Sequence, residues 1–271
     1  MTPVTATGAP APAARPPRPQ RLPVPPLQAY VLHRYDWSES SLILDLFTRE
    51  QGRVAVAAKG AKRPYSQMRA VLLPFQRIHA TIGRISGEEG AGEVQNLRGA
   101  EWAGGSAMLT GAALFSGFYL NELLMKMLAR HDPHPALFDI YAQTLPALAS
   151  ADEQKVQAAL RAFELSLLRE IGVLPDLSLV TLTQQPLDAD RRYALRADAG
   201  VVAAGGGDGE LSADVLVGLQ AALEHGSLDA LRYACERNLG ELRTVLRGLV
   251  HYHLGSSVLR TREVMRDLQS L

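Results

Sequence analysis

The sequence predicts an α+β protein, in which a small β-barrel near the N-terminus is followed by a mainly α-helical domain. Between Leu27 and Arg98, apolar and polar residues alternate in five short segments, and this period of two is typical of β-strands. After Ala100, apolar residues recur every three or four positions, which is the period of helices. With 271 residues and 47% hydrophobic content, the chain is long enough for two such parts and a substantial core.

The first 26 residues are expected to form a disordered tail rich in proline and alanine. They contain three arginines, no acidic residue and few bulky apolar side chains, so burial cannot offset the entropy lost on ordering. We favour a solubilising role for this tail over weak contact with a polyanion. The tail lacks the apolar core of a signal peptide, and no apolar run in the chain reaches the roughly 18 residues that span a bilayer. We therefore expect a cytoplasmic protein without a membrane partner.

The predicted barrel occupies residues 27–100 and contains five strands. They are expected at Leu27–Arg34, Ser41–Thr48, Arg53–Ala58, Phe75–Ile82 and Glu93–Arg98. A short connection that ends in Gly52 joins the second and third strands as a hairpin. Five short strands with one long connection after the third fit an OB-fold, although an SH3-like barrel has a similar pattern. Phe47 and Phe75 are expected to be core residues.

The predicted helical domain covers residues 101–271. Helices are expected at 109–128, 136–149, 152–171, 212–224, 227–255 and 261–268. Asp152 is a candidate N-cap of the third helix, and Gly172 is a suitable residue to end it. A small β-hairpin insert is expected at about 176–205, with its turn at 198–200.

Charge is distributed unevenly along a chain whose net charge is zero. Residues 49–84 contain eight lysines or arginines and one acidic residue, whereas residues 101–230 contain 8 basic and 17 acidic residues. Basic ends around an acidic middle suggest a polyanion site built from the ends of the chain. A solvated loop that happens to be basic is the alternative interpretation.

A nucleic-acid site on the barrel requires cations for phosphates and aromatic faces for bases. The predicted binding residues are Arg34, Trp37, Arg53, Lys59, Lys62, Arg63, Tyr65 and Arg69, with Tyr35, Arg77 and Arg84 as further candidates. An alternative role for Trp37 is to plug the end of the barrel. Arg260, Arg262 and Arg266 would extend the basic surface if the C-terminal helix lies near the barrel.

The sequence contains no pattern that indicates catalysis. It lacks a phosphate-binding Walker loop, a GxSxG motif and a convincing dinucleotide-binding loop. His251 and His253 are two positions apart on a predicted helix and diverge, which argues against a shared metal. The single cysteine, Cys235, excludes an internal disulfide and lies in a helical pattern typical of a buried thiol. We expect a protein that is not an enzyme and has no cofactor or metal.

Several segments, in order, resemble the RecO family of bacterial recombinational DNA-repair proteins. They are SESSLILDLFTREQGRVAVAAKGAKRPYS, LLPFQ, SGFYLNELL, ALRAFELSLLREIG and LRTREVMRDL. The resemblance runs from about residue 27 to 268 and implies an N-terminal OB-fold followed by a helical domain. Some relatives hold zinc with four cysteines in the second half. The matching stretch here, about 176–202, has none, so another feature must fold it.

The resemblance also implies a function. Family members bind single- and double-stranded DNA, anneal complementary strands, and bind RecR and the acidic C-terminal tail of single-stranded DNA-binding protein (SSB). These actions help to load RecA onto coated strands, with RecF as a further indirect partner, and place the protein at the nucleoid. Arg161 matches an arginine of the family motif and is the candidate for the SSB-tail carboxylate; a surface ion pair is the alternative. An RNA-binding OB-fold protein and an adaptor that joins only proteins remain alternative functions.

Overall fold

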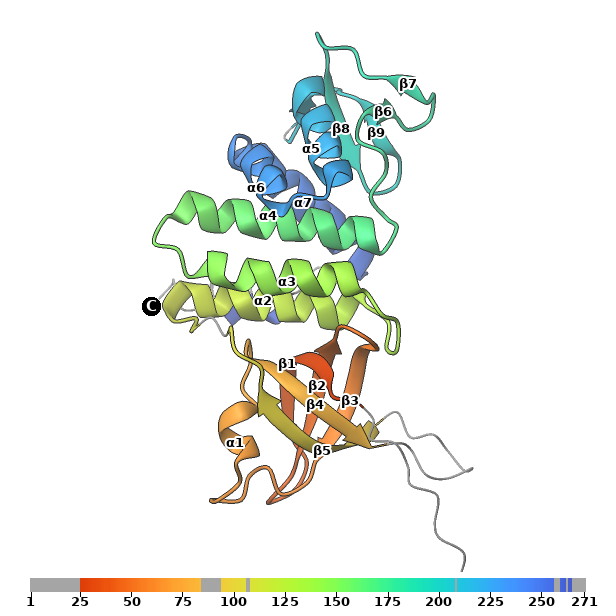
Figure 1. The fold of residues 1–271 in the computed structure, drawn as a ribbon. Coiled ribbons are helices and arrows are strands. Elements are labelled where there is room, and N and C mark those ends of the chain that lie inside the picture. Colours follow the sequence, from red (N-terminus) through yellow and green to blue (C-terminus); the bar gives the residue numbers. More distant parts are fainter. Residues whose placement is uncertain are drawn as a thin grey trace, which may run out of the picture.

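A computed structural model describes residues 25–83, 94–105, 108–207, 209–255, 259–261 and 263–264. A small barrel lies at one end of the molecule, layers of helices cover it, and small β-sheets lie beyond the helices (Figure 1). Nearly all of the predicted N-terminal tail lies outside the described residues, as do Arg84, Arg262 and Arg266.

The N-terminal part is a closed five-stranded barrel and has the predicted OB-fold. Its strands are β1 (Leu27–Asp36), β2 (Leu42–Thr48), β3 (Gly52–Ala58), β4 (Arg77–Gly83) and β5 (Val94–Trp102). The strand order is β1-β2-β3-β5-β4, in which β3 and β5 are parallel and the other pairs are antiparallel. Leu44, Leu46, Val54 and Val56 are fully buried inside the barrel, as their alternation in the sequence predicts.

Two strands of the barrel extend beyond their predicted bounds. Strand β1 continues to Asp36 and β5 to Trp102, so both strands are longer than expected. In addition, α1 (Met68–Val71) forms one helical turn in the connection between β3 and β4. Met68 and Val71 pack against the barrel core, and α1 contacts β5. The connection therefore covers one end of the barrel.

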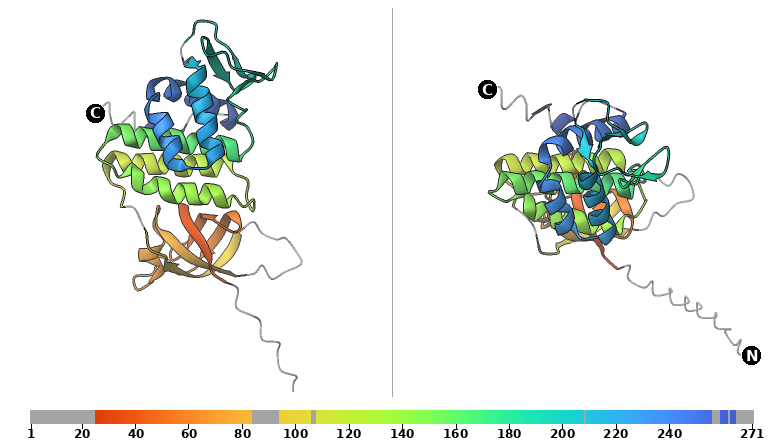
Figure 2. Two further views of the ribbon diagram at one scale, coloured as in Figure 1. Left: turned by 45° about the horizontal axis from the view of Figure 1, so that its top comes forward. Right: turned by 90° about the horizontal axis from the view of Figure 1, so that it is seen from above.

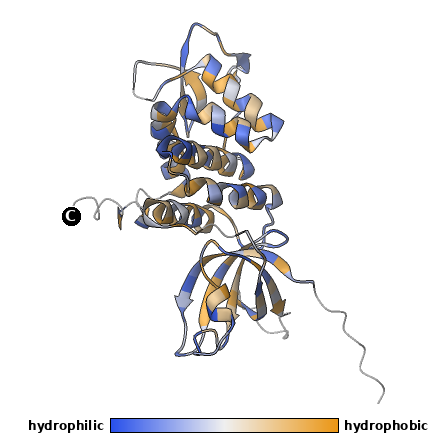
Figure 3. Ribbon diagram, turned by 60° about the vertical axis from the view of Figure 1, so that its left-hand side comes forward, coloured by the Kyte–Doolittle hydropathy of each residue, from blue (hydrophilic) through white to orange (hydrophobic). Residues whose placement is uncertain are grey.

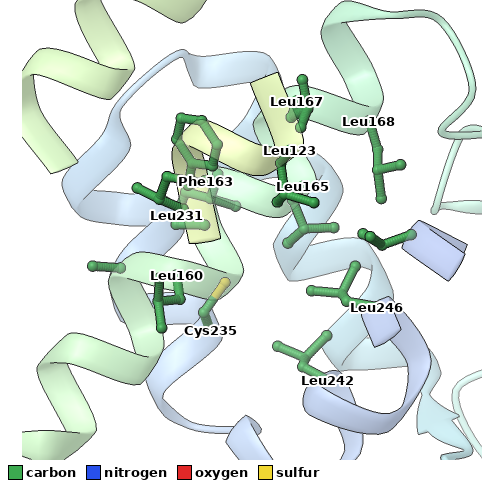
Figure 4. Close-up of a cluster of buried hydrophobic side chains, with 14 of the residues drawn as sticks. Leu123, Leu160, Phe163, Leu165, Leu167, Leu168, Leu231, Cys235, Leu242 and Leu246 are labelled. Atoms are coloured by element: carbon green, nitrogen blue, oxygen red, sulfur yellow. The ribbon is translucent and has the colours of Figure 1, made fainter. Parts of the chain in front are cut away.

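Within the described residues, six longer helices build most of the helical domain. They are α2 (Gly111–Met127), α3 (Pro135–Leu148), α4 (Glu153–Glu170), α5 (Ala213–His225), α6 (Leu228–Glu236) and α7 (Leu239–Leu254). Helix α4 lies at the centre and packs against α3, α6 and α7 (Figure 2). Its buried side chains Leu160 and Phe163 lie near Leu231 and Cys235 of α6 (Figure 4).

Helix boundaries mostly follow the sequence signals. Asp152 caps α4 as predicted, because its Oδ1 accepts from the backbone N–H of Gln154 at 3.0 Å. The prediction of a single helix at 227–255 is wrong, because α6 ends at Glu236 and a separate helix, α7, begins at Leu239. Asn238 has φ −140° and ψ 36°, outside the helical region, and lacks the aligned backbone that would continue α6.

The insert between α4 and α5 contains five short strands. They are β6 (Leu179–Val180), β7 (Gln185–Pro186), β8 (Arg192–Arg196), β9 (Gly200–Ala203) and β10 (Leu211–Ser212). The predicted hairpin is β8–β9, in which Arg196 pairs with Gly200. Tyr193 and Val201 are buried in the main helical core, and the Tyr193 hydroxyl accepts from the N–H of Asp188 at 2.7 Å. Apolar packing therefore holds this cysteine-free region.

The barrel and the helices share an aromatic interface. Tyr30 of β1 lies 5.3 Å from Phe138 and 5.0 Å from Tyr141 between ring centroids, and Phe47 of β2 lies 5.5 Å from Phe138. Asn121 of α2 donates to the Leu32 carbonyl at 2.9 Å. These contacts bury one outer face of the barrel against helices α2 and α3.

Candidate nucleic-acid interface

The two ends of the barrel face different surroundings. The turn between β2 and β3 meets the helices, because Arg49 in this turn forms an ion pair with Asp139 of α3 at 2.9 Å. The opposite end carries the loop after β1 and the long connection after β3. These loops lie away from the helices (Figure 1), and their colouring is largely hydrophilic (Figure 3). We call this the free end of the barrel.

Three predicted cations gather at the free end around one hollow of about 340 Å³. Arg34 comes from β1, Lys62 from the β3–β4 connection and Arg69 from α1. A register shift between Val31 and His33 in β1 places Arg34 opposite Leu44, a barrel-core residue, so Arg34 faces the barrel end. Apolar side chains complete the lining of the hollow: Leu42, Ala61 and Leu72.

The hollow also contains one carboxylate. Lys62 Nζ lies 2.9 Å from Asp36 Oδ1, and Arg34 Nη1 donates to the Leu72 carbonyl at 3.3 Å. The Asp36 side chain is 81% exposed, and an ion pair with such a partner contributes little to stability. Three cations against one exposed carboxylate leave a positive surface that attracts phosphate. Lys59 and Arg63 are exposed in the same connection.

Several aromatic residues that are close to these cations in the sequence have exposed side chains. Trp37, which follows Asp36, is 56% exposed, and Tyr65 is 98% exposed. Tyr35 is 47% exposed, and its ring lies 4.4 Å from that of His33. The alternative role of Trp37 as a barrel plug is therefore wrong. Phe47 and Phe75 are buried, as predicted.

Arg53 does not belong to this surface, and its prediction as a binding residue is wrong. It is 8% exposed, and its Nε and Nη2 donate to the Asp45 carboxylate at 3.1 and 2.9 Å. Its Nη1 donates to the Leu128 carbonyl at 2.8 Å and also to that of Met125. Arg53 lies at the barrel end that meets α2, so it serves the interface between the two parts.

Arg161 is also unavailable to a ligand in this structure. The residue is 5% exposed, and its Nη1 lies 3.0 Å from Glu164 Oε2, one turn along α4. A surface ion pair was the alternative to the SSB-tail role, and the observed pair with Glu164 lies in the core instead. Arg77 is half-buried and donates to Gln28 Oε1, and it is not among the residues that line the hollow.

The C-terminal segment is anchored to α2. The Glu122 carboxylate accepts from the backbone N–H groups of Arg260 and Thr261, both at 3.0 Å, and from the Thr261 hydroxyl at 2.7 Å. Burial opposes the ionisation of Glu122, but these hydrogen bonds and one from Lys126 outweigh it and lower the pKa of the carboxyl. Leu259, beside them, is buried. Arg260 and Thr261 are therefore held against helix α2.

Sequence reasoning missed Trp102, the last residue of β5, which is 61% exposed. The fifth strand was expected to end at Arg98, which placed this tryptophan outside the barrel. The sequence does contain a signal that Trp102 is exposed: it lies in the polar, glycine-containing stretch EWAGG, where a core tryptophan is unexpected.

The described part of the chain contains neither a metal-binding cluster nor a membrane-spanning helix. Among those residues, no group of three or more histidines, cysteines, aspartates or glutamates is placed to hold a metal ion. None of the described helices combines the length and apolar character needed to cross a membrane.

The barrel, its free cationic end and the helical domain define an OB-fold protein with an added helical domain. Family comparisons agree with this class. Residues 26–103 match the model for the N-terminal part of recombination protein O, and residues 108–263 match the model for its C-terminal part. The chain belongs to the RecO family of DNA repair proteins.

Individual relatives cover nearly the whole chain. The chain is similar to "DNA repair protein RecO" of Polaromonas naphthalenivorans (54% identity), Polaromonas sp. strain JS666 (53%) and Variovorax paradoxus (52%). Each comparison covers 90% of this chain and 96% of the relative.

Proposed function

We propose that the free end of the barrel binds single- and double-stranded DNA without sequence preference. The observation that carries this proposal is the convergence of Arg34, Lys62 and Arg69 around one hollow. Cations held together in this way displace counterions from phosphates, which favours any nucleic-acid sequence alike. Exposed Trp37 and Tyr65 add faces on which bases stack.

We further propose that the protein anneals complementary strands and helps to load RecA onto SSB-coated DNA. Membership of the RecO family supports this role. The test is annealing of SSB-coated complementary oligonucleotides, with and without the protein. We expect acceleration by the wild type and a large loss in a variant with Lys62→Ala and Arg63→Ala. Equal acceleration by that variant would reject the proposed surface.

Protein partners are proposed on family membership: RecR and the SSB tail directly, and RecF and RecA indirectly. An acidic peptide tail needs an apolar groove with a cation at one end. A second hollow, of about 470 Å³, lies between α3, α4, α5 and α6 and contains Arg169 with Ile140 and Leu231. Three carboxylates also line it, from Asp139, Glu170 and Glu224. Titration of a labelled tail peptide into the wild type and Arg169→Ala tests this hollow, and equal affinities would reject it.

RNA binding and a purely adaptor role are the competing functions. An OB-fold does not select the sugar by its fold, so competition between DNA and RNA oligonucleotides separates the first alternative. Absence of DNA binding at low salt would support the second. The proposal involves no catalytic step, and a cytoplasmic, nucleoid-associated location goes with it.

A further inference from the structure

Both tryptophans of the chain are exposed on the barrel. Trp37 is 56% and Trp102 is 61% exposed. A single exposed apolar side chain is common and carries no functional meaning alone. The position of Trp102 relative to the cations is therefore what matters.

Trp102 lies at the same end of the barrel as the cationic hollow. Strand β5 is antiparallel to β4, and Trp102 pairs with Ile78 near the start of β4. Strand β1 is also antiparallel to β4, so β1 and β5 end on the same side. In the barrel order, β4 separates β5 from β1 on one side, and β2 and β3 separate them on the other. Trp37 and Trp102 are therefore on different sides of one barrel end.

Helix α1 lies between these two sides. It contacts β5, and it lies beside the end of β5 in Figure 1. It also carries Arg69, which lines the hollow shared with Asp36, the residue before Trp37. On one side of the hollow, Trp37 follows the lining residue Asp36 in the chain. On the other side, α1 carries Arg69 and contacts β5, the strand that ends at Trp102. Stacking faces thus flank a group of cations.

We propose that Trp102 is a second base-stacking platform, for a single strand that crosses the free end of the barrel. The strand's phosphates would pass over Arg34, Lys62 and Arg69, and its bases would stack on Trp37 at one side and Trp102 at the other. The inference rests on the proposed nucleic-acid function and deepens it, because it assigns a preference for strand type. Base faces are accessible in single strands and covered in a duplex, so Trp102 acts on single strands alone.

The two-tryptophan composition allows a direct test. Trp37→Phe leaves Trp102 as the sole tryptophan emitter, and Trp102→Phe leaves Trp37. Each variant is titrated with a thymidine oligonucleotide of about 16 nucleotides, the upper site size of one OB-fold. Fluorescence anisotropy of a labelled oligonucleotide measures total binding in parallel. We expect quenching of Trp102 emission, with the same midpoint as the anisotropy change.

Affinity of Trp102→Ala provides the second readout. Loss of one stacked base weakens single-strand binding by roughly 5- to 150-fold, and duplex binding is unchanged. Tyr233→Ala is the matched control, because Tyr233 is an exposed aromatic residue (64%) on helix α6 of the helical domain. Thermal melts verify that each variant is folded, and Trp102→Phe is expected to retain most of the affinity.

Two results would overturn the assignment of Trp102. One is unchanged Trp102 emission while anisotropy reports binding, and the other is wild-type single-strand affinity in Trp102→Ala. Either result would favour a protein partner for this tryptophan and leave the proposed function intact. Failure of the wild type to bind DNA at low salt is a different outcome, which would reject the proposed function and this inference together.

Discussion

Arg53 and Asp45 form a buried bidentate ion pair on the outer face of the β2–β3 hairpin, with N–O distances of 3.1 and 2.9 Å. The same guanidinium donates to the Leu128 carbonyl at the C-terminal end of α2. Carbonyl groups at a helix end lack partners within the helix, so Arg53 satisfies one of them and joins the barrel to the helical domain. Arg53 is therefore a structural residue, whereas Lys59, Arg63 and Arg69 in the connection after β3 are exposed.

Replacing Arg53 is expected to destabilise the fold. Arg53→Met leaves Asp45 buried without its counter-charge, which costs about 3–5 kcal/mol in comparable sites. Urea denaturation measures the loss. Arg49→Ala is the control, because its ion pair with Asp139 is over 40% exposed on both sides and should matter far less. Equal stability of the two variants would contradict the assigned role of Arg53.

Gly52 allows close contact between the β2–β3 turn and the segment after α2. Its φ is +68°, and a Cβ there would lie 1.9 Å from the Asp132 carbonyl oxygen. Gly60 is a matched control, since its φ is +73° but the nearest atom to an added Cβ is 3.6 Å away. Gly60→Ala should cost only the left-handed strain, about 1–2 kcal/mol. Gly52→Ala should cost clearly more in urea denaturation, and a similar cost would show that the contact is unimportant.

Glu122 should make stability depend on pH in acid. Its pKa is lowered in the folded state, so its stabilising contribution is complete above the unfolded pKa of about 4.3 and is lost as pH falls through the folded value. Glu122→Gln removes this contribution. The stability difference between wild type and variant should therefore shrink as pH falls below about 4. A difference that stays constant between neutral and acid pH would contradict ionic anchoring of the C-terminal segment.

Cys235 should be inert in the native protein. It is fully buried, and burial raises the pKa of its thiol to about 12, with Glu164 adding to the effect. A thiol reagent such as DTNB at pH 8 should react only after unfolding. Titration in increasing urea should release one thiol in step with the loss of helical signal. Rapid reaction without denaturant would contradict the packing between α4 and α6.

Local patterns predicted the barrel well because each signal is short in range. The alternation of Leu44, Leu46, Val54 and Val56 indicated the barrel interior directly. The failures concern contacts between distant segments. Nothing near Arg53 reveals that α2 will cover it, because its partners Met125 and Leu128 lie about seventy residues away.

The candidate site was predicted in part for the same reason. Lys62 and Arg69 lie in one basic, loop-like segment, so their exposure followed from composition. The inclusion of Arg34 in the same hollow depends on a register shift in β1, which the sequence does not mark. The importance of Trp102 was missed because the predicted fifth strand ends at Arg98, whereas β5 continues to Trp102.

The central claim is that Arg34, Lys62 and Arg69 form a phosphate-binding surface, and the salt dependence of single-strand affinity tests it most directly. Changing all three to alanine should weaken binding and make the slope of log K against log salt shallower by about 2, at roughly 0.7 per contact. The control changes Arg191, Arg192 and Arg196, which are exposed and paired with carboxylates in the insert. It should leave the slope unchanged. A wild-type slope in the Arg34, Lys62 and Arg69 variant would contradict the account.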